Sequence, residues 1–212
     1  MSTVLTAVQE GDAGRLARLL REAPELAQRA AGADSPLLAA LYRGRRDLAE
    51  IVLSAGPALD GFEAAAADEV AALERALAAD ASLPRARSAD GFTALHLAAF
   101  FGGARAAARL LAAGADPGAV AAMNQVQPLH SAAAGGHHEI ARLLLEAGAD
   151  PSARQQGGFT PLHAAGQAGD AELARLLLTA GARPNLRDDA GSTAADLADR
   201  GGHTATATLL RP

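Results

Sequence analysis

The sequence predicts an all-α solenoid in which helix-turn-helix units stack side by side along the chain. The first observation is an internal repeat whose period is 34, 33 and 33 residues. The second is a composition with 50% hydrophobic but only 3% aromatic residues and no Trp, which favours thin helical layers built from Ala, Leu and Val. The third is the regular return of helix start and stop signals within each repeat. The matching residues that define this period are Thr93, Gln127, Thr160 and Thr193.

One repeat shows how each unit is built. Thr160 and Pro161 are a helix start, because the hydroxyl caps the first turn and the proline ring fits it. Gly169 ends that short helix, and Asp170 caps a second helix with leucines on one face. Gly181 ends the second helix, and the turn residues that follow predict a projecting loop. One such pair cannot bury its own apolar stripe, so neighbouring pairs must stack.

These repeats carry TPLH-like starts, a Gly before the second helix and GAD-like endings, and the pattern resembles ankyrin repeats. The resemblance implies an all-α ankyrin-repeat solenoid of about seven stacked helix-turn-helix units with β-hairpin-like loops. It covers residues 88–212 most strongly. The single array of residues 1–212 is expected to divide into units at 1–30 (N-terminal cap), 31–58, 59–87 (degenerate), 88–121, 122–154, 155–187 and 188–212 (C-terminal cap).

The degenerate units have features of their own. Residues 5–26 align with residues 62–83 at a constant offset of 57, which indicates an internal duplication. Asp68 stands where a Gly is expected between the helices of the third pair, so we expect a disturbed turn and a local bend there. Thr204, Thr206 and Thr208 in the last helix predict a polar outer face for the C-terminal cap.

Charge and cysteine content exclude several functions. The formal charge is -5 and no run of Lys or Arg could neutralise adjacent phosphates, so we expect no nucleic acid partner. The absence of Cys excludes disulfides and thiolate metal sites and fits a reducing compartment, with the cytoplasm as the expected location. We expect no signal peptide and no membrane association, because no uncharged apolar run approaches about 18 residues.

The histidines do not predict a metal site. His96, His130 and His163 recur one repeat apart, at about 10 Å, which is too far for ligands of one zinc ion. The resemblance implies instead that they bond backbone groups and brace the loops. His137, His138 and Glu139 fit a capped helix start and lack HExxH spacing. We find no nucleophile elbow and no isolated carboxylate pair, so we expect no enzyme, no cofactor and no metal.

The groove formed by the first helices and the loops is where the resemblance places a protein partner. Five of the six aromatic residues occupy positions expected to face it, and exposed aromatics anchor interfaces well. Phe92, Phe100, Phe101 and Phe159 form the expected hot spot, although the same residues could simply pack loop against helix. The full set of expected partner-binding residues is Tyr42, Arg43, Phe92, Phe100, Phe101, Met123, Asn124, Gln125, Arg154, Gln155, Gln156, Phe159, Gln167 and Arg200.

The predicted function is therefore a protein-binding adaptor or inhibitor that is a monomer. A self-associating structural subunit is an alternative, because Phe100 and Phe101 could equally serve a homo-oligomer. A small-ligand binder is a weaker alternative, because solenoid grooves are shallow. An enzyme is also a weaker alternative, because it would need a convergent set of ionisable groups in the groove, for instance around Arg43, His138 or Arg200. Fold alone does not identify the partner.

Overall fold

Helices in consecutive pairs make up the protein. The computed structural model describes residues 3–28, 34–122 and 124–211. Its helices, in chain order, are α1 (Thr3–Glu10), α2 (Ala13–Glu22), η1 (Pro24–Ala27, a 3-10 helix), α3 (Pro36–Tyr42), α4 (Arg46–Ser54), α5 (Gly61–Ala66), α6 (Val70–Ala79), α7 (Ala94–Phe101), α8 (Ala104–Ala112), α9 (Pro128–Gly135), α10 (His138–Glu146), η2 (Gln156–Gly158, also 3-10), α11 (Pro161–Ala168), α12 (Ala171–Thr179), α13 (Ala194–Arg200) and α14 (Thr204–Leu210).

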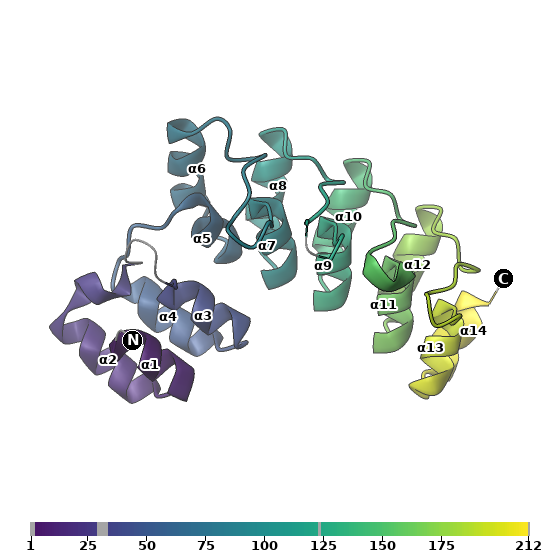
Figure 1. The fold of residues 1–212 in the computed structure, drawn as a ribbon, viewed down its shortest axis with the longest axis horizontal. Helices are drawn as coiled ribbons and strands as arrows, with labels where there is room; N and C mark the ends of the chain where they lie inside the picture. Colours follow the sequence, from purple (N-terminus) through teal and green to yellow (C-terminus); the bar gives the residue numbers. More distant parts are fainter. Residues whose placement is uncertain (1–2, 29–33, 123, 212) are drawn as a thin grey trace.

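The pairs stack into an arch with α1 and α14 near opposite ends (Figure 1). From α5 onward the first helix of each pair packs against the first helix of the next, as α7 does on α9 and α11 does on α13. Within the described ranges no residue is in a β-strand, so the hairpin-like form expected for the loops is not confirmed. Backbone hydrogen bonds nevertheless tie neighbouring loops, from Gln156 N–H to Asn124 O (3.0 Å) and from Asp189 N–H to Gly157 O (2.9 Å).

Local sequence explains where the helices begin and end. Asp170 accepts a hydrogen bond from the Leu173 N–H (2.9 Å) and caps α12, as predicted. Thr93 accepts one from the His96 N–H and caps α7. The hydroxyl of Thr160, the expected cap of α11, lies 2.8 Å from His163 Nδ1. Gly169 adopts a φ of 69°, the left-handed conformation that ends α11 without a side-chain clash.

The core is divided into two clusters. Buried side chains of α1–α4, such as Leu16 and Leu48, form one cluster, and those of α5–α14 form the other. Leu59, between α4 and α5, packs against both. In Figure 1 the helices α1–α4 are tilted relative to the rest of the row. We call this junction between α4 and α5 the break in the array.

Asp68 does form the turn between α5 and α6, so the disturbed turn expected there was wrong. Its φ is 58°, in the left-handed region where a Gly was expected. The Asp68 carboxylate accepts hydrogen bonds from the Ala106 N–H (2.7 Å) and the Arg105 Nε (2.8 Å). It therefore caps α8 in the next pair.

The C-terminal cap also differs from expectation at one position. Thr204 and Thr208 are exposed as predicted, but Thr206 is 3% exposed and its hydroxyl donates to the Gly169 carbonyl (2.9 Å). Thr206 therefore joins α14 to the preceding pair and does not belong to the polar outer face.

Candidate functional site

The recurring histidines brace one unit against the next loop. Each Nδ1 accepts a hydrogen bond from the backbone N–H at the start of its own helix, at 3.2 Å for His96 and 3.1 Å for His163. Each Nε2 lies 3.0 Å from a carbonyl of the following loop: Val126 for His96, Ala153 for His130 and Ser192 for His163. Because a carbonyl only accepts, Nε2 carries the proton. The three rings are committed to the backbone, as the resemblance implied.

Burial lowers the pKa of all three histidines below the usual value, which keeps them neutral. Among the residues that the structure describes, no group of three or more His, Asp or Glu side chains is placed to hold a metal ion. No helix there is long and apolar enough to cross a membrane.

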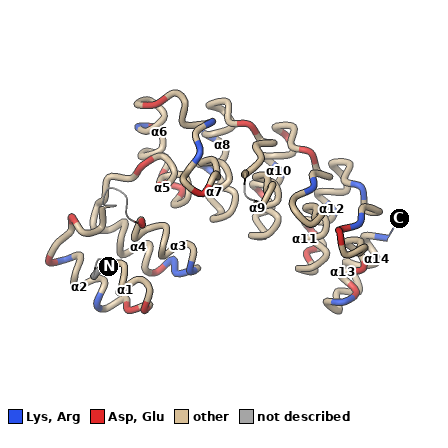
Figure 2. The backbone as a smooth tube through the Cα atoms, in the orientation of Figure 1, with Lys and Arg blue, Asp and Glu red and all other residues tan. Residues whose placement is uncertain are grey.

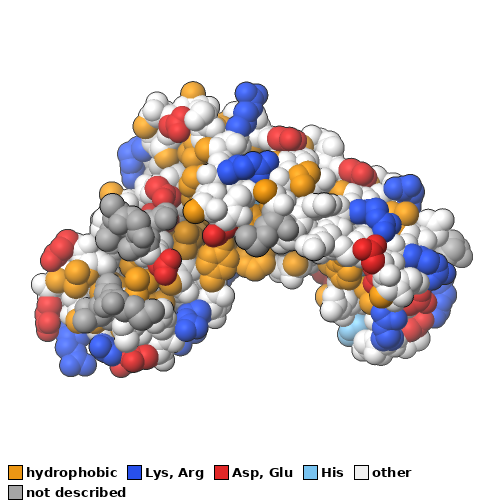
Figure 3. All heavy atoms as spheres, viewed as in Figure 1, with side chains coloured by type: hydrophobic (Ala, Val, Ile, Leu, Met, Phe, Trp, Pro, Cys, Tyr) orange, Lys and Arg blue, Asp and Glu red, His pale blue; other side chains and the backbone are white. Residues whose placement is uncertain are grey.

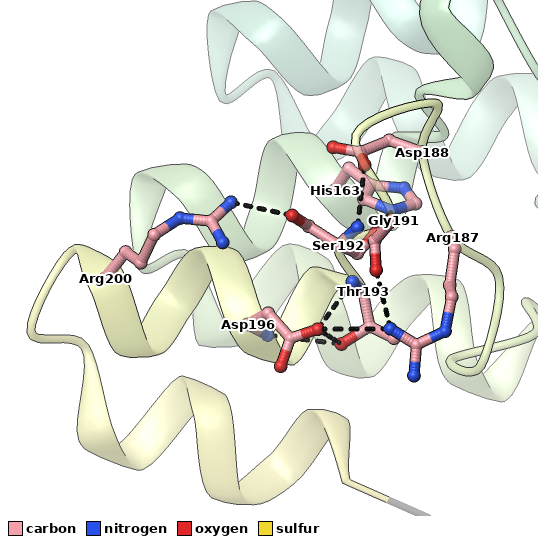
Figure 4. A network of polar contacts seen from close by, with 8 residues as sticks. All are labelled: His163, Arg187, Asp188, Gly191, Ser192, Thr193, Asp196 and Arg200. Atoms are coloured by element: carbon pink, nitrogen blue, oxygen red, sulfur yellow. Dashed lines mark hydrogen bonds and ion pairs between the residues drawn. The ribbon is translucent and has the colours of Figure 1, made fainter.

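In the loop before α13, several polar side chains are hydrogen-bonded within the loop or to the helix that follows it (Figure 4). Arg187 Nη1 donates to the Gly191 carbonyl (2.6 Å), and the Asp188 carboxylate accepts from the Ser192 N–H (2.8 Å). Arg200, an expected partner-binding residue, donates to the Ser192 hydroxyl (3.1 Å). Arg200 therefore has a structural role within this loop.

An apolar hollow of about 200 Å³ lies between α3, α7, α9 and the adjoining loops. Five of the expected partner-binding residues line it: Tyr42, Phe92, Phe100, Asn124 and Gln155. None of its lining residues is Asp, Glu, Lys or Arg. We call it the uncharged hollow.

Helix ends and loop hydrogen bonds position the rings of the uncharged hollow. Tyr42 ends α3, Phe100 lies at the end of α7, and their ring centroids are 6.3 Å apart. Phe92 precedes the N-cap of α7, its N–H donates to the Ser88 hydroxyl (3.2 Å), and its ring lies 5.6 Å from that of His96. Tyr42 is 51% exposed and Phe100 is 44% exposed. Large aromatic surface is therefore open to a partner.

Four of the first helices carry no charged residue. These helices are α3, α7, α9 and α11, whereas the second helices α10 and α12 carry both Arg and Glu and α8 carries Arg. Figure 2 shows the contrast along the backbone. In Figure 3 hydrophobic side chains gather on the inside of the arch where it bends.

Phe101 does not join the uncharged hollow, although it was expected in the same hot spot. Its ring lies 4.9 Å from that of Tyr42, edge to face, and it lines a separate hollow at the break with Leu41 and Arg46. Arg46 Nη2 donates to the Phe101 carbonyl (3.2 Å). Phe101 thus joins the two halves of the array.

The other expected residues lie outside the uncharged hollow. Phe159 packs its ring 5.2 Å from that of His163. Arg43 donates to the Gln9 carbonyl (3.0 Å), and Arg154 lies 3.7 Å from Asp189. Gln125, Gln156 and Gln167 are exposed, and Met123 lies outside the described residues.

Sequence reasoning missed six of the residues that line the uncharged hollow. The missed residues are His96, Leu97, Val126, His130, Ser131 and Ala134. Leu97 and Ser131 follow the recurring histidines directly, so their shared place in the repeat was an available signal. Their exposure to a hollow depends on how far apart neighbouring helices lie, which no local pattern specifies.

A family model described as ankyrin repeats (three copies) matches residues 62–155, 110–188 and 129–211. Together these ranges cover residues 62–211, well over half of the chain, and the chain belongs to the ankyrin-repeat family. Repeats of this family are generally protein-protein interaction modules without catalytic activity. A comparison with curated proteins found no match.

Proposed function

We propose that this protein is an adaptor or inhibitor that binds a partner protein through the groove centred on the uncharged hollow, without catalysis. The observation that carries the proposal is the meeting of Tyr42, Phe92 and Phe100 around an open apolar hollow. The partner site includes Asn124 and Gln155, whose amides donate and accept hydrogen bonds at its edge. A preformed groove limits the entropy lost on binding.

The proposal extends to the organisation of the chain. Residues 1–212 form one array of seven units, with the caps and boundaries expected from the sequence, and the seven consecutive pairs between α1 and α14 support it. The protein acts as a monomer in a reducing compartment such as the cytoplasm.

Phe92 and Phe159 provide a matched test. Each precedes the N-cap threonine of its unit and packs on that unit's histidine, but only Phe92 lines the uncharged hollow. We therefore compare Phe92→Ala and Phe100→Ala with Phe159→Ala in affinity capture from cell lysate, after circular dichroism has shown that all three fold. A stoichiometric partner should be retained by Phe159→Ala and lost by the other two.

Two results would contradict the proposal. The groove assignment is wrong if all three variants retain the partner equally. The self-associating alternative gains support if the mass in light scattering rises with concentration and Phe100→Ala restores the monomer.

A further inference from the structure

A second hollow adjoins the uncharged hollow and differs from it in charge. It has a volume of about 280 Å³, and both hollows are lined by Tyr42 and Leu97. Its other lining residues include Asp60, Arg87 and Asp90. We call it the acidic hollow, because it holds two carboxylates and one guanidinium.

The positive group of the acidic hollow, the Arg87 guanidinium, is hydrogen-bonded to backbone carbonyls. Arg87 Nη1 donates to the carbonyls of Gly91 and Val120, both at 2.8 Å, and so braces two neighbouring loops. The Asp60 carboxylate caps α5 by accepting from the N–H groups of Phe62 (2.9 Å) and Glu63 (2.8 Å).

Asp90 is different, because it is exposed at the tip of the loop before α7. Burial first, and then the charge of Asp90, raise the pKa of the Tyr42 phenol above its usual value of about 10. The phenol therefore remains a hydrogen-bond donor at neutral pH. Asp90 and Tyr42 line the acidic hollow together, and Tyr42 also lines the uncharged hollow.

We propose that the groove recognises a partner segment that carries a bulky apolar side chain and, within a few residues, a Lys or Arg. The apolar side chain fills the uncharged hollow, and the cation lies at the acidic hollow beside Asp90. This inference rests on the proposed function, because it specifies the chemistry of the protein bound in that groove.

Size and charge both favour this occupant. At about 200 Å³ the uncharged hollow is smaller than the roughly 300–1,000 Å³ typical of small-molecule sites, so it suits one side chain of a larger partner. A charged side chain there would lose its water without meeting a counter-charge. An acidic segment would meet the exposed carboxylate of Asp90 in the neighbouring hollow, so charge complementarity selects a basic one.

The test is a selection of random dodecapeptides displayed on phage against the full chain. We expect enriched peptides to pair a Leu, Ile, Met, Phe or Trp with a Lys or Arg one to four positions away. Selection against Asp90→Lys should shift the second preference to Asp or Glu. The matched control is Glu146→Lys, which changes net charge equally on α10, outside the lining of either hollow.

Affinities of the enriched peptides then give the size of each effect. Asp90→Lys should weaken binding about 3- to 10-fold at low salt and less at high salt, and Glu146→Lys should change it less than about twofold. Phe100→Ala should weaken every enriched peptide more than about tenfold.

The outcomes separate this inference from the proposed function. If Phe100→Ala abolishes binding but Asp90→Lys leaves both the selected sequences and their affinities unchanged, the groove binds protein and the apolar-basic specificity is wrong. If no peptide is enriched, or if none depends on Phe100, both proposals fail. Occupation by a second copy of the chain, seen as a dimer that Phe100→Ala dissociates, would also overturn the inference.

Discussion

His138 Nε2 lies 2.6 Å from the Oδ2 of Asp170, and this contact links α10 to the start of α12 in the next pair. Asp170 uses its other oxygen to cap α12. The imidazole Nδ1 also lies 3.4 Å from Glu172. A single side chain thus couples helix capping to the stacking of two units.

The His138–Asp170 contact should make part of the stability depend on pH. The hydrogen bond to Asp170 raises the pKa of His138, partial burial opposes it, and the charges of Asp170 and Glu172 add to the increase. Since the folded pKa lies above the unfolded value, the stabilisation is complete below about pH 6.5 and is lost as pH rises through the folded pKa. His138→Gln should therefore cost up to about 1 kcal/mol at pH 6 and little at pH 9, measured by urea unfolding. An equal cost at both pH values would refute the ionic contribution.

The three buried histidines should make the protein less stable as pH falls, the opposite of the effect of His138. Burial lowers the pKa of His96, His130 and His163, so the unfolded chain binds protons more readily than the folded one as pH falls. Stability should decrease from pH 7 to pH 5, and most clearly in His138→Gln, where the opposing contribution is absent. NMR titration of the imidazoles provides the direct check: the three rings should remain neutral with the proton on Nε2 at pH values where His138 is charged.

Replacing Gln127 should stabilise the protein. Gln127 starts α9 where the equivalent positions hold Thr, and its side-chain oxygen Oε1 is buried without a hydrogen-bond partner in the described structure. Gln127→Thr introduces a favoured N-cap and removes the buried amide, so the free energy of unfolding should rise by about 1 kcal/mol. Thr93→Ala, which removes a hydroxyl that accepts from the His96 N–H at the start of α7, should lower it by a similar amount. A lower melting temperature for Gln127→Thr would contradict this reasoning.

Asp68 combines a left-handed backbone with the cap of α8. Asp68→Ala should lose both contributions, at about 1–2 kcal/mol for the backbone and about 1 kcal/mol for the cap. Asp68→Gly should lose the cap alone, because Gly tolerates positive φ. Asp68→Asn should be the mildest change, since Asn adopts the same conformation and its side chain still has an acceptor oxygen. The order Asn, Gly, Ala in decreasing melting temperature is the expected result, and a different order would show that the backbone and the cap are not separable.

Gly166 allows α11 and α13 to approach closely. A Cβ at this position would overlap the carbonyl oxygen of Ala194. Gly to Ala normally favours a helix by about 0.5–1 kcal/mol, but forced overlap in a packed interface costs about 1–3 kcal/mol, so Gly166→Ala should be destabilising. Gly14→Ala, in α2 with only an ordinary contact to Asp12, is the control and should be neutral or stabilising.

The local features of this fold could be predicted from sequence because short-range physics determines them. Thr93 and Asp170 cap helices, Gly169 ends one, and the period places His96 and His163 alike. Asp68 was misjudged because its compensating contacts come from Arg105 and Ala106 in the next pair, and such contacts between units leave no local pattern.

The candidate site also depends on contacts between units, so the sequence could indicate only some of its residues. Phe92 and Phe100, both in the expected hot spot, line the uncharged hollow together, but position in the repeat alone could not separate Phe100 from Phe101. The two side chains follow one another in α7, and the tilt of α3 and α4 decides that one lines the uncharged hollow while the other lies at the break. Phe159 stands in a local sequence similar to that of Phe92, GFTPLH against GFTALH, yet only Phe92 lines the uncharged hollow with Tyr42.

The break has a thermodynamic consequence for any ligand of this groove. Tyr42 belongs to the half of the molecule whose core lies in α1–α4, whereas Phe92 and Phe100 belong to the half built on α5–α14. A ligand that contacts all three binds only when both halves are folded and docked. By mass action it then stabilises the α1–α4 half against local unfolding by RT ln(1 + [L]/Kd), although most of its contacts lie on the other half. Amide exchange in α1 and α2 would accordingly report the occupancy of a site to which neither of these two helices contributes a lining residue.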